Sequence, residues 1–435
     1  MKEDFLHYVW KFQKFDVFDF YTTNNEKFHI RNKGSHNLNS GPDFFNSQIE
    51  LAGQLWAGNI EIHIKSSDWY AHGHETDPAY DNVILHVVWE HDAEIFRNDG
   101  SKISTFVVKE HVSKNTLEQY NKLFSKEKKW INCETDFELV DDFIIDNWLE
   151  RLFFERLQKK EMLLLKELKD SQNHWESLLF RMLCKNFGLK VNADSFFSIA
   201  KSVDFSVVKK CSHDRQDLEA LLMGQAGLLE GDNEDWYFKT LKAKYDYLKH
   251  KFALKNEMVI VPKFFRLRPP NFPTVRLAQL AMLYFKRDNL FSQVIAIENL
   301  EDFYELFNIC GSDYWSKHYN FGISSLERKK RITKNFVDLL IINTIIPLKF
   351  SYSQQQGKDV SEEILLLASK ISSEENTIVA KFNSLRHISK SAYQSQALLQ
   401  LKSGYCDANK CLQCAVGNSI IGSEKEIDKN QQIQN

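Results

Sequence analysis

Residues 59–65 constrain the fold more than any other part of this chain. Apolar and polar side chains alternate there, so that one face carries Ile60, Ile62 and Ile64 and the other carries Glu61, His63 and Lys65. This period of two predicts a half-buried β-strand. A carboxylate, an imidazole and an ammonium on one face are costly unless they meet solvent, pair with one another or hold an ion. The segment therefore predicts both a sheet and a polar site.

The surrounding segments predict that this strand belongs to a mixed domain of helices and strands. A first helix is expected at residues 4–12, before a hairpin that turns at Asn24-Asn25. Further strands are expected near residues 43–51, 55–65, 83–89 and 103–109. The strand at 83–89 is almost continuously apolar, which is typical of a strand covered on both faces. This order of helix, meander, crossover and further strand indicates an α/β or α+β core.

The pair Pro42-Asp43 and the tripeptide Glu61-Ile62-His63 together resemble the PD-(D/E)XK nuclease superfamily. The resemblance implies a restriction-endonuclease-like α/β domain over residues 1–115 that hydrolyses nucleic-acid phosphodiesters. It also implies that Asp43 and Glu61 hold Mg²⁺ or Mn²⁺ through carboxylate oxygens. The chain departs from the usual pattern, because His63 stands where a lysine is expected and Lys65 lies two residues later. Either His63 or Lys65 could orient the attacking water or neutralise charge in the transition state.

Two longer segments resemble a bacterial family more specifically. They are EIHIKSSDWYAHGHETDPAYDNVILHVVW near the front of the chain and YCDANKCLQCAVGN near its end. Both are similar to domain-of-unknown-function family 2851. This second resemblance implies no activity.

A second cluster of polar residues follows the alternating strand within a short span: Asp68, His72, His74, Asp77, Tyr80 and His86. The His72-Gly73-His74 pair could chelate zinc, although two histidines on a polar loop need bind nothing. Asp77-Pro78 suits the start of a short helix, with Asp as the cap and Pro in the first position. A zinc hydrolase that uses His72, His74 and Asp77 is therefore an alternative to the nuclease. In the simplest alternative, Glu61 and Lys65 form only a surface ion pair.

From about residue 115 the apolar residues recur at helical spacing. This pattern predicts a large all-α domain over residues 116–421. The polar tail at residues 422–435 is expected to be disordered.

Three cysteines near the end of the chain follow the pattern Cys406-x4-Cys411-x2-Cys414. Two thiols at the shorter spacing can face one ion, so we expect a metal such as zinc here, with free thiols as the alternative. The nuclease resemblance implies an iron–sulfur cluster in place of zinc, because some exonucleases of that superfamily close such a cluster with C-terminal cysteines. The fourth ligand is expected from Cys184, Cys310 or a histidine elsewhere in the helical domain.

Charge and hydropathy limit the class of partner. A formal net charge of −3 argues against coating nucleic acid by bulk electrostatics but is compatible with a local basic groove. The candidate stripes are residues 122–129, 263–276 and 328–334. In the second stripe, Arg266, Arg268 and Arg276 alternate with phenylalanines, which is typical of single-strand binding but also of a loop anchored by its aromatic residues.

The chain opens without a signal-peptide pattern, and its richest apolar run, residues 336–350, is shorter than a membrane span and holds Asp338, Asn343 and Pro347. We therefore expect a cytoplasmic protein that is not inserted in a membrane. The favoured function is metal-dependent cleavage of DNA or RNA. The alternatives are the zinc hydrolase and a non-catalytic scaffold on the same fold that binds nucleic acid or protein.

Overall fold

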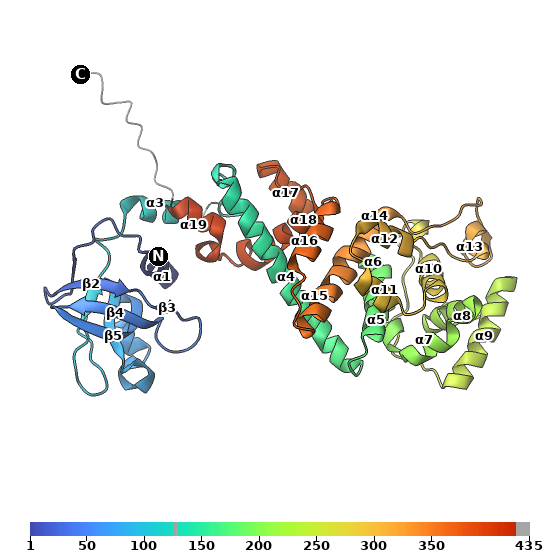
Figure 1. Ribbon diagram of the computed structural model, residues 1–435, viewed down its shortest axis with the longest axis horizontal. Coiled ribbons are helices and arrows are strands. Elements are labelled where there is room, and N and C mark those ends of the chain that lie inside the picture. The colour runs from blue at the N-terminus through green and yellow to red at the C-terminus, as the bar shows by residue number, and fades with distance from the viewer. Residues whose placement is uncertain (126, 128, 423–435) are drawn as a thin grey trace, which may run out of the picture. The chain divides into compact units, whose positions relative to one another are not determined.

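The computed structural model describes residues 1–125, 127 and 129–422, which divide into two compact units (Figure 1). The first unit comprises Met1–Trp148 and Leu401–Asn435, and the second comprises Leu149–Gln400. The sequence prediction ended the first domain at residue 115 and assigned the cysteine motif to the helical domain. The first unit continues to Trp148 and also includes the chain from Leu401 to Gly422. Of the predicted disordered tail, Gly422 is helical and residues 423–435 lie outside the described part.

A seven-stranded sheet forms the centre of the first unit. Its strands run in the order β1-β2-β4-β5-β6-β7, and β3 pairs with β4. The pairs from β1 to β5 are antiparallel, whereas β5, β6 and β7 are parallel. The bounds are β1 (Phe20–Tyr21), β2 (Lys27–Asn32), β3 (Ser35–His36), β4 (Phe44–Leu51), β5 (Gln54–Lys65), β6 (Val83–Glu90) and β7 (Thr105–Val107). The mixed α/β class, the hairpin and the four main strands are therefore confirmed.

Strand β5 is covered differently along its length. Its first residues are exposed, but Ile60, Glu61, Ile62 and His63 are all buried. The alternation predicted a strand with one solvent-exposed face, and this part of the prediction is wrong. The reason is that the chain between β5 and β6 folds back over the polar face. It forms the short helices α2 (Asp68–Ala71), η1 (His74–Thr76) and η2 (Pro78–Tyr80), which pack over a small apolar cluster made of Trp69, Tyr80, Val83, Ile95 and Ile103.

Helix α1 (Glu3–Phe12) covers the apolar face of the sheet. His7 of α1 meets the ring of Phe44, which is the cross-strand partner of Ile60 and so lies on the same face. Beside this helix, buried aromatic rings from β1, β2 and β7 pack together, with Phe106 meeting both Phe20 and Phe28 at ring distances of 5.3 and 5.1 Å. These contacts form the main core of the first unit.

The end of the chain returns to this unit. Helix α19 (Ala415–Gly422) packs beside α3 (Lys114–Leu123), and the adjoining turns η6 (Lys402–Cys406) and η7 (Cys411–Gln413) precede it (Figure 1). The hydroxyl of Tyr8 in α1 also donates to the carbonyl of Asn418 at 3.5 Å. The division between the units falls within α4 (Asp142–Asp170), after the short turn η3 (Phe137–Leu139).

The second unit is helical, as the sequence predicted, apart from the small hairpin of β8 (His318–Asn320) and β9 (Ile323–Ser324) among its described residues. Its remaining helices are α5 (Trp175–Phe187), α6 (Leu189–Lys201), α7 (Phe205–Cys211), α8 (Arg215–Gln225), α9 (Trp236–Phe252), η4 (Pro269–Asn271), α10 (Pro273–Lys286), α11 (Leu290–Ala296), α12 (Leu300–Leu306), α13 (Asp313–Lys317), α14 (Lys334–Leu340), η5 (Ile341–Ile345), α15 (Ile346–Gln355), α16 (Ser361–Lys370), α17 (Thr377–Leu385) and α18 (Ala392–Leu401).

The apolar run predicted to be short lies in a longer continuous helix, Lys334–Gln355, which has the length and composition of a membrane span. The π-helical turn η5 lets the helix continue past Pro347, because the wider turn tolerates the missing N–H of proline. Most of its apolar window is buried inside the protein. This burial is typical of the core helix of a soluble protein.

The aromatic core predicts which residues hold the sheet together. Replacing fully buried Phe106 by alanine should cost about 3–5 kcal/mol of unfolding free energy, because it leaves a cavity among several rings. Phe18, which is 61% exposed, serves as the matched control, and Phe18→Ala should cost less than about 1 kcal/mol. Hydrogen exchange of peptides from β4 to β6, read by mass spectrometry, reports this unit separately. Equal protection in the two variants would contradict the assignment of the core.

Candidate functional site

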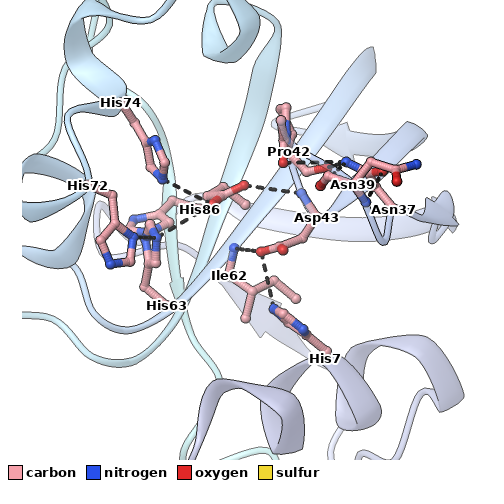
Figure 2. Close-up of polar contacts among 12 residues, drawn as sticks. His7, Asn37, Asn39, Pro42, Asp43, Ile62, His63, His72, His74 and His86 are labelled. Atoms are coloured by element: carbon pink, nitrogen blue, oxygen red, sulfur yellow. Dashed lines mark hydrogen bonds and ion pairs between the residues drawn. The ribbon is translucent and has the colours of Figure 1, made fainter. Parts of the chain in front are cut away.

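The buried polar end of β5 meets the loop that follows it. Glu61 and His63 project from β5 on the face opposite Ile62. His72 directly follows α2, and His74 begins η1, so the short helices bring both imidazoles over the strand (Figure 2). The three histidines offer one ring nitrogen each within 4.8 Å of one another. We refer to His63, His72, His74 and Glu61 as the histidine–glutamate cluster.

The contacts inside this cluster are short. His63 Nε2 lies 3.1 Å from His72 Nδ1. The Glu61 Oε1 atom lies 3.3 Å from His74 Nε2 and 3.5 Å from His63 Nε2. The separation of the two histidine nitrogens matches that of two atoms that bind one metal ion at about 2.0–2.2 Å, and the Glu61 oxygen lies beside them. His63 is buried, His74 is partly covered and His72 is exposed, so the cluster is open to solvent on one side.

Neighbouring residues fix the orientation of the imidazoles. His86, buried on β6, lies with its Nε2 2.8 Å from His63 Nδ1. If His63 Nδ1 donates this hydrogen bond, its Nε2 lone pair faces the cluster, as metal ligation requires. Tyr80 stacks on His74 with ring centroids 3.8 Å apart. His86 and Tyr80, predicted as accessory residues, therefore surround the cluster and support it.

Burial also sets the protonation of the cluster. It lowers the pKa of His63 to about 3, and the neighbouring histidines add to this shift. His63 is therefore neutral near pH 7. Burial raises the pKa of Glu61 to about 6, and the charge of Asp43 adds to this effect while the hydrogen bond with His74 opposes it. A buried carboxylate beside the neutral imidazole of His63 is an arrangement that a cation stabilises.

Asp43 lies beside Glu61 but makes different contacts. Its backbone N–H donates to Glu61 Oε2 at 3.1 Å, and its own Oδ2 accepts from the backbone N–H of Ile62 at 2.9 Å. These reciprocal bonds fix the start of β4 against β5. The same Oδ2 lies 3.2 Å from His7 Nε2. Burial lowers the pKa of His7, but the Asp43 carboxylate outweighs this effect and raises the pKa overall.

The other residues predicted near the strand have structural contacts. Lys65 is exposed at the end of β5, where its ammonium lies 4.0 Å from the Glu90 carboxylate. Between His63 and Lys65, it is therefore His63 that contacts Glu61 among the described residues. Asp68 accepts from the Lys65 N–H at 2.9 Å, and Asp77 caps η2 by accepting from the Ala79 N–H at 2.9 Å. Asp77 thus has the capping role that its sequence suggested.

The predicted nucleic-acid contacts in the second unit divide into two groups. Arg266 and Arg268 are exposed, and the Arg266 guanidinium lies 5.1 Å from the ring of Phe265. Arg276 is buried, however, and its guanidinium lies 3.7 Å from the centre of the Phe336 ring while donating to Gln279 and Asn271. Its prediction as a nucleic-acid contact is wrong, because helix α10 turns this side chain into the core.

The three C-terminal cysteines line one hollow together with a fourth, Cys133. The sequence prediction sought the fourth ligand at Cys184, Cys310 or a histidine of the helical domain, and both of these cysteines belong to the second unit. Cys133 lies in a turn more than 250 residues earlier in the chain, and no spacing motif connects it to the others. His7 was missed for the same reason, because a single histidine on an amphipathic helix carries no local signal.

The low pKa of His63 predicts acid sensitivity in the metal-free protein. An unfolded histidine titrates at about 6.5, so between that value and about 3 the unfolded chain binds the extra proton. The free energy of unfolding should therefore fall as pH decreases through this window. From pH 7 to pH 5 the wild type should lose about 2 kcal/mol more than His63→Gln, measured by denaturant unfolding with a chelator present. Equal losses would contradict the burial of a neutral His63.

Comparison with known proteins assigns the chain to a family but does not indicate an activity. No curated protein and no solved structure matches the chain. A family described as "Protein of unknown function (DUF2851)" matches residues 3–377, which include α1, the whole sheet and most of the second unit. The histidine–glutamate cluster and Cys133 lie within the matched range, whereas Cys406, Cys411 and Cys414 follow it. The chain belongs to the DUF2851 family.

Proposed function

We propose that the first unit is a metal-dependent hydrolase whose ion is held by His63, His72 and His74. The observation that carries this proposal is the approach of one nitrogen from each imidazole to within 4.8 Å of the other two. Imidazole ligands suit zinc and related transition metals, whereas Mg²⁺ prefers oxygen ligands. Three protein ligands would leave a further position for water or substrate, as in catalytic zinc sites, and exposed His72 lies on the open side.

Glu61 is the general base in this proposal. Its Oε2 is held by the Asp43 N–H, and its Oε1 is directed at two of the proposed ligands. A carboxylate so held can take the proton from an attacking water beside the ion, and a pKa near 6 suits this role at neutral pH. The ion would polarise the scissile ester and lower the pKa of the water.

The proposed substrate is a nucleic-acid phosphodiester. Two features support this choice. The first is that Asp43 immediately precedes β4 and Glu61 lies on the next strand, β5. The second is the order of the elements, in which helix α1 is followed by the antiparallel strands and then by a crossover to the parallel strand β6. A restriction-endonuclease-like domain implies the same order. His7, whose pKa is raised beside Asp43, would supply positive charge near the phosphate. In an alternative form of this hydrolase, the Mg²⁺ version, the carboxylates of Asp43 and Glu61 would hold Mg²⁺ or Mn²⁺ and the substrate would be the same.

Metal binding tests the ligand assignment directly. His72→Ala and His74→Ala should each weaken zinc binding to metal-free protein at least about tenfold in calorimetric titration. His29→Ala is the matched control, because His29 is an exposed histidine on β2 of the same unit and should leave the affinity unchanged. Any zinc bound by cysteines is common to all variants and cancels in the comparison. Unchanged affinity in both cluster variants would exclude this site.

Cleavage tests the proposed chemistry. With Zn²⁺ or Mn²⁺, the wild type should cleave DNA or RNA, and Glu61→Gln should reduce the rate by about 10²–10⁴-fold while keeping the fold. Lys65→Ala should retain activity within about twofold, because surface changes away from the site are usually tolerated. A large loss in Lys65→Ala with an unaffected His72→Ala would favour the Mg²⁺ version. If the wild type cleaves nothing with any of these ions, the scaffold function replaces the hydrolase.

A further inference from the structure

Four cysteines from two distant parts of the chain surround one space in the first unit. Cys133 lies in the turn before η3, Cys406 ends η6, Cys411 begins η7 and Cys414 immediately precedes α19. All four line the same hollow. The other lining side chains are mainly apolar and include Ile131, Phe137, Leu401 and Val416. The four thiols are free and form no disulfide.

Polar hydrogens are directed at the sulfur atoms. The side-chain amide of Asn132 donates to Cys411 Sγ at 3.4 Å. Burial raises the pKa of the Cys414 thiol to about 11, and the backbone N–H groups of Val416 and Gly417, in the first turn of α19, oppose this shift. Donors of this kind stabilise the negative charge that thiolate ligands carry and tune metal centres. They are not needed for packing thiols in an apolar core.

The close approach of α19 to the cysteine loop depends on one glycine. A Cβ atom added to Gly417 would lie 2.1 Å from the carbonyl oxygen of Cys411, a distance that real atoms do not adopt. Glycine at this position therefore lets the helix start directly against the turn that carries Cys411 and Cys414. The loop is shaped so that its sulfurs and the N–H groups of the helix face the same space.

The spacing of the sulfurs favours a cluster over a single ion. In the described part of the chain, the histidines form the one group in which three ligand atoms all lie within 4.8 Å of one another. Every set of three among these sulfurs therefore contains a pair that is farther apart. Sulfurs on one zinc ion at about 2.3 Å would all lie closer than this. An iron–sulfur cluster is held by thiolates on separate iron atoms, which spreads the ligands.

We infer that Cys133, Cys406, Cys411 and Cys414 hold an iron–sulfur cluster. The cluster ties the turn before η3 to the returning end of the chain, so its binding free energy also stabilises the fold of the first unit. This inference is independent of the proposed hydrolase, because the histidine–glutamate cluster shares no ligand with it.

Metal analysis of the full-length protein, purified without oxygen, tests the inference. The wild type should contain about four iron and four sulfide atoms per chain, or about two of each for the smaller cluster, with a broad visible absorption. Cys133→Ser should lower the iron content at least about tenfold. Cys211→Ser is the matched control, because Cys211 is buried like Cys133 but lies in the second unit, and it should keep the iron. His72→Ala should also keep it.

A second measurement applies if Cys133→Ser fails to fold. In the native wild type, all four thiols should resist alkylation, and all four should react once the cluster is removed by an iron chelator and an oxidant. Three results would overturn the inference: one zinc per chain that Cys133→Ser loses without any iron being present, disulfides among these residues, or iron that Cys133→Ser retains.

Discussion

The burial of Glu61 and His63 within the sheet is the constraint on which the candidate site depends. A carboxylate and an imidazole are expensive to remove from water, so the surrounding structure must satisfy them. It does so with the backbone N–H of Asp43 on one side of Glu61 and with imidazoles on the other. The same contacts define where β4 begins, how the crossover loop lies and which histidines meet. A metal ion would complete this arrangement, because imidazole nitrogens and a buried carboxylate both gain from a cation.

The second constraint is the return of the chain to the unit in which it starts. Helix α19 packs beside α3, and the cysteine turns before it approach the segment around Cys133. The first unit is therefore made of residues separated by most of the sequence, and its two candidate metal sites differ in ligand chemistry. The imidazole site lies partly open to solvent, as a reactive centre needs, while the thiol site has a mainly apolar lining, as a structural cluster prefers.

Sequence patterns predicted the secondary structure, which depends on neighbours along the chain. They were less successful in predicting which side chains are buried, because burial depends on tertiary packing. The alternation at residues 59–65 correctly predicted a strand, but the burial of its polar face depends on how the crossover folds back. Arg276 belonged to a basic stripe in the sequence, yet helix α10 directs its side chain into the core. His72 and His74 were recognisable as a pair, whereas the role of His63 between them and His86 required the parallel register of β5 and β6.

By itself, the sequence determined the strand order along the chain, the helical second half and the presence of two groups of metal-binding residue types, because periodicity and short spacings are local properties. The tertiary structure decided which members of those groups meet. It placed His63 rather than Lys65 against Glu61, brought His7 to Asp43, and joined Cys133 to three cysteines at the other end of the chain. These contacts arise from strand pairing, helix packing and chain return, which bring together residues that no local pattern connects.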